Sequence, residues 1–256
     1  MKLRIFCHAA GAALLFGAAA ISAQADSHES PPQPGILDAY ACDLNDGKDM
    51  DDLMSARDYY VEQYEKNGLT TPTAYIWSLL KGDAPTELIW FDVHESLQAF
   101  AQSADAAIAA TGLEKVQERF DSVITCQSSN VAAILPVYER EGGGEGPVFI
   151  SSNACNMRHG IGEAHVADLQ RHISGVLGSM EGMTPQAVYM GSPISRGPNS
   201  ADRYLFAVND SVSAWADFVA GLGSSDAGAQ LGRHFDMVFD CSATMWTAQQ
   251  VVSNEE

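Results

Sequence analysis

The sequence predicts an α+β protein in which one βαββαβ module occurs twice. Three observations support this prediction. Four blocks of sequence recur in the same order, strand-like and helix-like segments follow the same order in each half, and each half carries two cysteines at matching positions. With 46% hydrophobic residues among 256, the chain can build a globular core.

The repeat consists of four matched blocks separated by one short insertion. The pairs are residues 41–44 with 154–157, 68–74 with 182–187, 91–101 with 206–216, and 120–126 with 235–241. Within these pairs Phe91 matches Phe206 and Ser96 matches Ser211. Four blocks in one order indicate that a single module was duplicated.

Each half predicts the same secondary structure from its hydrophobic periodicity. In the first half we expect strands over residues 36–42, 74–80, 88–93 and 131–137, and helices over 51–66 and 96–123. In the second half we expect strands over residues 148–155, 187–191 and 204–208 and one beginning near Cys241, and helices over 162–180 and 211–238. Asn67 and Gly68 are a typical helix end.

Residues 1–25 read as a signal peptide. Lys2 and Arg4 precede an apolar stretch that is too short to span a membrane, and residues 23–25 form a small-x-small cleavage site. We therefore expect a periplasmic or secreted protein without a membrane span. The expected segments after the signal peptide are a disordered leader over 26–34, a first module over 35–140, a Gly-rich linker over 141–147, a second module over 148–252 and an acidic tail over 253–256.

The chain is strongly acidic, with a formal net charge of −19. Removal of the signal peptide takes away Lys2 and Arg4 but no acidic residue, so the mature protein is more acidic still. Nucleic acid and anionic membranes would repel such a surface. We therefore expect neither as a partner.

Four cysteines remain after removal of the signal peptide: Cys42, Cys126, Cys155 and Cys241. An even number in an exported chain favours disulfides over metal ligands. In a βαββαβ sheet the first and last strands are adjacent and antiparallel, so the end of the first faces the beginning of the last. Of the three possible connectivities, this topology and the repeat predict Cys42–Cys126 and Cys155–Cys241.

Two βαββαβ units in tandem resemble a fused form of the dimeric α+β barrels. The motifs C-x4-G, F-x-V-[HN]-[ED]-S and F-D-x-V-x-x-C also resemble those of exported bacterial proteins of unassigned activity. The resemblance implies two ferredoxin-like modules packed face to face as a pseudo-dimeric α+β barrel, which a monomer would form internally. This superfamily includes heme-handling enzymes, quinone-forming monooxygenases and proteins without a known reaction. The resemblance therefore makes heme a candidate cofactor but assigns no activity.

Candidate ligand-binding residues lie on the central strands and at their ends. Aromatic side chains at alternating positions could line a space between the two sheets, although such residues more often form a core. His94, at the end of a strand, is a candidate heme ligand or acid–base residue, but Asn209 takes its place in the second half. The candidate set is Tyr75, Trp77, Trp90, His94, Tyr189 and Tyr204.

A weak candidate for metal binding occurs on the first helix of the second module. His165 and His172 share a helical face with Asp168, and such a row could hold a metal or relay protons. The first module lacks matching histidines, so a polar helix edge is the preferred interpretation and no metal is predicted.

These features leave three functional hypotheses, and the catalytic residues stay unknown. The first is an exported protein without catalytic activity that binds a small apolar molecule or a protein partner between its sheets. The second is an enzyme of the monooxygenase or heme-handling type, with His94, Trp77 and Trp90 near the ligand. The third is a structural scaffold with no pocket.

Overall fold

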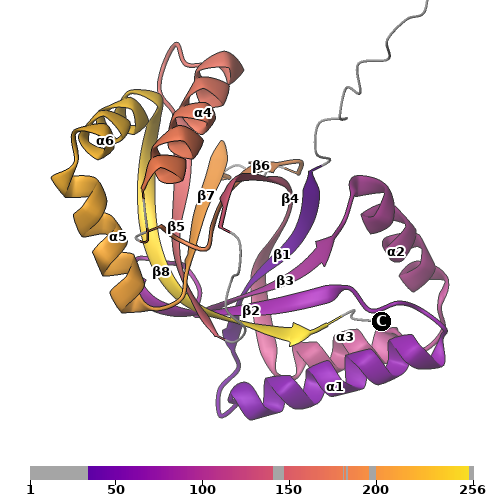
Figure 1. The fold of residues 1–256 in the computed structure, drawn as a ribbon. Helices are drawn as coiled ribbons and strands as arrows, with labels where there is room; N and C mark the ends of the chain where they lie inside the picture. The colour runs from indigo at the N-terminus through magenta and orange to yellow at the C-terminus, as the bar shows by residue number, and fades with distance from the viewer. Residues whose placement is uncertain (1–33, 141–146, 181, 183, 196–199, 254–256) are drawn as a thin grey trace, which may run out of the picture. The chain divides into compact units, whose positions relative to one another are not determined.

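A computed structural model describes residues 34–140, 147–180, 182, 184–195 and 200–253 (Figure 1). The first module comprises β1 (Gly35–Leu44), α1 (Met50–Lys66), β2 (Thr73–Gly82), β3 (Leu88–His94), α2 (Leu97–Ala109), α3 (Glu114–Asp121) and β4 (Ile124–Glu139). The second comprises β5 (Val148–Met157), α4 (Glu163–Ser179), β6 (Ala187–Pro193), β7 (Arg203–Asn209), α5 (Val212–Ser224), α6 (Asp226–Val238) and β8 (Phe239–Val252). The predicted α+β class and the two ferredoxin-like modules are confirmed.

The long second helix expected in each module is two helices. In the second module, the Ser225 side chain caps the start of the second of these helices by accepting a hydrogen bond from the Gly228 backbone N–H at 2.9 Å. A Cβ at Gly228 would lie 2.0 Å from the Leu222 carbonyl oxygen, so the two helices meet at a point that only glycine allows. In the first module the break lies at Gly112, whose φ is +85°.

The eight strands form one closed antiparallel barrel in the order β1-β3-β2-β8-β5-β7-β6-β4. Each module contributes four adjacent strands, with its first strand between its third and fourth. The modules join where β2 pairs with β8 and β4 pairs with β6. The two sheets that were expected to pack face to face are therefore also hydrogen-bonded along both edges, and the expected space between sheets is the interior of a barrel.

Side chains point alternately into the barrel and out toward the helices, because successive residues of a strand face opposite sides. One hydrophobic cluster fills the outer layer of each module, around Leu53 and Trp90 in the first and around Leu169 and Met190 in the second. A third cluster, which includes Trp77, Phe91, Phe206 and Trp246, lies inside the barrel. Much of the sheet is thus covered on both faces, although residues 125–129 of β4 are exposed.

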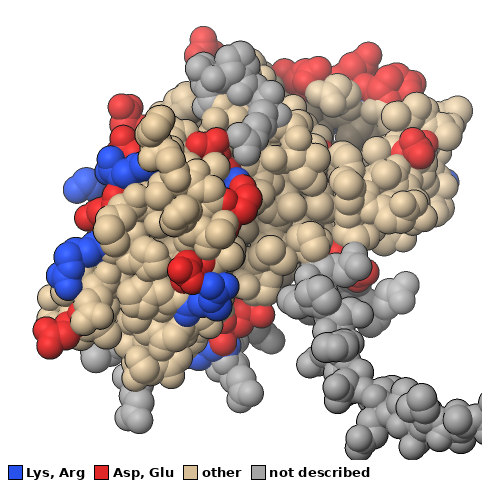
Figure 2. All heavy atoms as spheres, turned by 90° about the horizontal axis from the view of Figure 1, so that it is seen from above, with Lys and Arg blue, Asp and Glu red and all other residues tan. Residues whose placement is uncertain are grey.

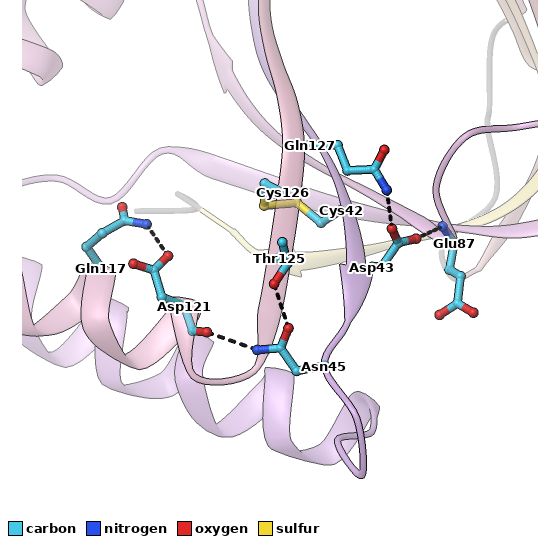
Figure 3. The surroundings of a disulfide bond; sticks show 9 residues. All are labelled: Cys42, Asp43, Asn45, Glu87, Gln117, Asp121, Thr125, Cys126 and Gln127. Carbon is cyan, nitrogen blue, oxygen red and sulfur yellow. Dashed lines mark hydrogen bonds between the residues drawn. A yellow bond between two sulfur atoms is a disulfide. The ribbon is translucent and has the colours of Figure 1, made fainter.

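Both predicted disulfides are present, Cys42–Cys126 between β1 and β4 and Cys155–Cys241 between β5 and β8. Each joins residues that lie directly opposite one another in the strand register. Figure 3 shows the first disulfide with flanking hydrogen bonds, in which Asn45 donates to the Asp121 carbonyl at 2.9 Å and accepts from Thr125 at 2.7 Å. These contacts tie the end of β1 to the start of β4 beside the covalent bond.

The predicted signal peptide, most of the leader, linker residues 141–146 and tail residues 254–256 lie outside the described residues. Within the described part of the chain, no helix is long and apolar enough to cross a membrane. Figure 2 shows more acidic than basic side chains on the face that it presents, with wide uncharged areas between them.

Candidate functional site

The barrel interior contains a cavity of about 740 Å³ that is partly open to solvent. Both modules contribute to its walls, which are mainly aliphatic and aromatic. The apolar and aromatic lining residues are Leu37, Tyr75, Trp77, Phe91, Val93, Ile134, Pro147, Val148, Ile150, Tyr189, Phe206, Val208 and Ala248. A volume of this size is in the usual range for small-molecule sites.

A few polar groups accompany these apolar walls. Gln186, Gln249 and Gln250 line the cavity together with the hydroxyl-bearing Tyr75 and Tyr189. Burial raises the pKa of both tyrosines, and for Tyr189 the hydrogen bond that its hydroxyl donates to Glu139 at 2.9 Å adds to the effect. Tyr75 can therefore offer its O–H to a ligand, whereas the Tyr189 hydroxyl, whose hydrogen goes to Glu139, can accept a hydrogen bond.

Beyond Phe206 along β7, the barrel interior is filled by hydrogen-bonded polar side chains. The Trp246 indole N–H lies 2.9 Å from the Ser152 hydroxyl and 3.0 Å from the Thr244 hydroxyl. Asn130 donates to the Tyr204 hydroxyl at 2.9 Å. Trp77 stands between this region and the cavity, with its ring centroid 5.1 Å from that of Phe206 and 6.4 Å from that of Trp246.

A second group of titratable side chains lies on the outer surface of β1 and β3, beneath the helices of the first module. Asp38 and Asp92 are directly opposite each other in the register of these strands. Tyr40 donates to Asp38 at 2.7 Å, and the Trp90 indole N–H donates to Asp92 at 2.9 Å. We call Asp38, Tyr40, Trp90, Asp92 and His94, with Tyr60 and Tyr64 of α1, the outer cluster.

Burial changes the ionisation of the outer cluster. It raises the pKa of Asp92 to about 7, and the negative charge of Asp38 adds to this effect although the Trp90 hydrogen bond opposes it. It also raises the pKa of Asp38, against the hydrogen bond from Tyr40. Burial lowers the pKa of His94, which favours the neutral imidazole, and the charge of Asp38 offsets part of that effect.

The structure separates the sequence-predicted ligand residues into two groups. Tyr75, Trp77 and Tyr189 line the barrel cavity, and Tyr204 faces the same interior without lining it. Trp90 and His94 lie on the outer surface of β3 instead, where Trp90 packs against Tyr60 and Phe120, and His94 against Phe100. The two groups are on opposite faces of one sheet and cannot contact one ligand.

The weak metal candidates do not converge on one point. His165 accepts a hydrogen bond from the Gly162 backbone N–H, Asp168 pairs with Arg171, and His172 lies 3.0 Å from His234 of α6 through the Nδ1 atoms. Within the described parts of the chain, no three His, Cys, Asp or Glu side chains are grouped as metal ligands would be. Each candidate has a structural partner.

Sequence reasoning missed Asp38, Asp92, Tyr40, Tyr60 and Tyr64, because their proximity depends on strand register and on the docking of α1. One signal for them was available in the repeat. Asp92 aligns with Ala207 in the matched block, so this position of the strand is charged in one module only.

No protein-family model matches the sequence, and no curated protein matches it significantly. Solved structures do resemble the fold. A proposed monooxygenase from Fusobacterium nucleatum superposes with a TM-score of 0.55 at 11% identity, covering 86% of this chain and 94% of the other. An anthrone oxidase-like protein superposes with a TM-score of 0.51 at 9% identity, covering 88% of this chain and 96% of the other. A proposed chlorite dismutase superposes with a TM-score of 0.51 at 8% identity, covering 86% of this chain and 96% of the other.

The fold is a pseudo-dimeric α+β barrel formed by two ferredoxin-like modules of one chain. Together with the closed strand order, these similarities establish the architecture over nearly the whole described chain. At identities near one in ten they carry the fold alone, so function has to be argued from the cavity and the outer cluster.

Proposed function

We propose that the protein binds a small, uncharged, largely aromatic molecule inside its barrel. The observation that carries this proposal is the cavity of about 740 Å³ with aromatic and aliphatic walls from both modules. The described lining includes no Asp, Glu, Lys, Arg or His, so a charged ligand group would enter unpaired at a high desolvation cost. Tyr75 and the glutamines give a ligand one polar edge to bind.

Heme does not fit this cavity. Iron would need an axial His, Cys, Met or Tyr, and the described lining offers only Tyr75 and Tyr189. No Arg or Lys of the described lining is placed to pair with propionate groups. His94, the candidate axial ligand, lies on the other face of the sheet.

Oxygenation of a bound aromatic molecule is the second candidate function. The similarity to proteins described as a monooxygenase and as anthrone oxidase-like favours it. Such chemistry requires a group that removes a proton from the substrate, and the described cavity lining contains no carboxylate or imidazole for this task. Binding is therefore the function that the cavity supports best.

The two disulfides support a place of action in the periplasm or outside the cell, because disulfides persist in oxidising compartments. Binding within one chain also agrees with a monomer, since the two modules already form the closed barrel that separate subunits would otherwise build.

The test is a fluorescence titration with the uncharged probe N-phenyl-1-naphthylamine, followed by competition with naphthol and native mass spectrometry of the purified protein. We expect Val148→Trp, which places an indole in the cavity, to weaken binding at least tenfold. Ala220→Trp, the same side chain on the exposed surface of α5, is the matched control and should bind normally. Equal binding by both variants, or no saturable binding by the parent protein, would contradict the proposal.

A further inference from the structure

We propose that the outer cluster is a second binding site, which takes a small organic cation of the alkylammonium class between α1, α2 and the sheet. This site lies on the opposite face of β3 from the barrel cavity, and its occupant is charged where the barrel ligand is neutral. The inference therefore stands or falls separately from the proposed function.

The first argument is an unbalanced negative charge. Asp38 and Asp92 face each other across neighbouring strands, and among the described residues neither forms an ion pair with Lys or Arg. His94, the only basic side chain of the cluster, is held toward its neutral form. Two partly buried carboxyl groups without a cationic partner are costly to retain, and a bound cation would remove that cost.

The surrounding elements supply no alternative counter-charge. Tyr60 and Tyr64 face the pair from α1, and Phe120 packs against Tyr60 and Trp90 from α3. The only charged residue of α2, Asp105, is acidic and exposed. On the other neighbouring strands Ala74 lies opposite Asp92 and Val131 opposite Asp38, so His94 is the one basic group described beside the carboxyl pair.

The second argument is the duplicated module itself, which provides an internal control. The strand registers match, with Ile36 opposite His94 in one module and Phe149 opposite Asn209 in the other. At the positions of Asp38 and Asp92 the second module carries Ser151 opposite Ala207. The module therefore folds without the carboxyl pair.

The helix above the sheet differs in the same way. Helices α1 and α4 have equal length, and the positions of Tyr60 and Tyr64 in α1 are occupied by Ile173 and Leu177 in α4. Acid pair and tyrosines thus occur together in one module and are absent together from the other. Joint occurrence indicates one shared role.

The third argument is access. A crevice of about 270 Å³ lies between α1 and α2, lined by Tyr64, Leu69, Thr70, Ala99, Gln102 and Ser103, among others. Tyr64 is the one outer-cluster residue in the described lining of this crevice, and neither carboxyl group lines it. Burial and, to a smaller extent, the negative charge of Asp92 raise the pKa of Tyr64. Helix α2 has no fully buried residue, so it covers the sheet lightly.

The chemistry of the walls selects an organic cation over a metal ion. Calcium needs six to eight oxygen ligands, and in the described chain the two carboxyl groups are not part of any group of three potential ligands. One oxygen of each carboxylate already accepts a hydrogen bond, from the Tyr40 O–H at Asp38 and from the Trp90 N–H at Asp92, which leaves few oxygens for a metal ion. Aromatic faces beside a carboxylate are instead the recognised surroundings of alkylammonium groups.

Isothermal titration of the full mature protein with choline and with tetramethylammonium, at about pH 8, tests the proposal. We expect saturable binding of both and none of dimethylbutanol, in which carbon replaces the choline nitrogen. Asp92→Asn should weaken binding at least tenfold. Glu95→Gln, which removes an exposed negative charge on the residue that follows His94, should not. Because Asp92 must lose its proton, affinity should also fall about tenfold per pH unit below its pKa.

Tyr64→Leu, which introduces the residue of the second module, is a further variant in case Asp92→Asn is poorly folded. It should also weaken binding, and circular dichroism verifies that each variant is folded. Absence of binding by the parent protein, equal binding of dimethylbutanol, or full affinity in folded Asp92→Asn or Tyr64→Leu protein would overturn the proposal.

Discussion

The two modules have the same strand register and helices of matching length, yet they differ in what lies between the sheet and the first helix. In the first module this layer contains two carboxyl groups, an imidazole and several tyrosines. In the second, the matching positions on β7 and α4 carry Ala207, Leu205, Ile173 and Leu177.

The difference separates residues that the fold requires from residues that it tolerates. Features present in both modules, such as the disulfides and the helix-capping serines, belong to the architecture. Features present in one module only are not required by the shared fold. Experiments that treat one module as a control for the other can therefore test each assignment.

Removing one disulfide should give the largest loss of stability, and it should be similar in both modules. Cys42–Cys126 closes a separation of 84 residues and Cys155–Cys241 one of 86. The chain-entropy argument gives about 4.5 kcal/mol for each. Urea denaturation of the Cys42→Ser/Cys126→Ser and Cys155→Ser/Cys241→Ser proteins measures the two losses. A large loss of stability in only one of the two double variants would show that the disulfides are not equivalent parts of the fold.

Replacing the buried carboxyl should stabilise the first module in a pH-dependent manner. The folded-state pKa of Asp92, about 7, is above its unfolded value, so the native state retains a proton that the unfolded chain has lost between about pH 4 and pH 7. The free energy of unfolding therefore falls as pH rises through this window and then levels off. After allowance for solvent screening, Asp92→Asn should be about 2 kcal/mol more stable than the parent at about pH 8.

The stability of the two proteins should converge at about pH 4, where Asp92 is protonated in the parent. Denaturation curves at several pH values measure this, with Glu95→Gln as the control for removal of one acidic charge. A gain from Asp92→Asn that does not change with pH would mean that the carboxyl group titrates normally.

The second module has a buried charged residue that the first module lacks, and it lies beside the disulfide of the second module. Arg203 is buried and pairs with the exposed Glu163, whereas the first module has Leu88 and Met50 at these two positions. Glu163→Met alone leaves a buried guanidinium without its partner and should cost about 1.5 kcal/mol. The double change Glu163→Met/Arg203→Leu copies the first module and should regain most of that loss, as measured by thermal unfolding. A double variant less stable than the single would show that the ion pair contributes in its own right.

The features that could be predicted from the sequence are those that follow from the order and spacing of strands and helices along the chain. Strand order, the positions of α1 and α4 and both disulfides follow from a motif that occurs twice, so each half checks the other. Closure of the barrel through β2–β8 and β4–β6 pairing required knowledge of which strand edges remain exposed in each module. One sequence does not contain that information.

The face of each strand was beyond prediction for a physical reason. Helices cover the outer face and the barrel encloses the inner one, so apolar residues occur on both and the usual alternation is lost. Trp90 and Phe91 are adjacent and both buried, but they belong to different layers. This ambiguity placed His94 and Trp90 beside Trp77 in one expected ligand site. The pairing of Asp38 with Asp92 likewise depends on register, which the sequence leaves open.

The smallest expected effect concerns the serines that begin the second helix of each module. Ser96 accepts a hydrogen bond from the Ala99 backbone N–H and Ser211 from that of Ala214, both at 3.1 Å. Ser96→Ala and Ser211→Ala should each cost about 1 kcal/mol, because one N–H of the first helical turn loses its acceptor. The two losses should add in the double variant, since the serines lie in different modules and share no partner.

Because α2 has no fully buried residue while α5 buries Phe218, amide exchange should report the first loss as local fraying and the second as part of global unfolding. Identical exchange patterns would imply that α2 is held by more than its few contacts with the sheet.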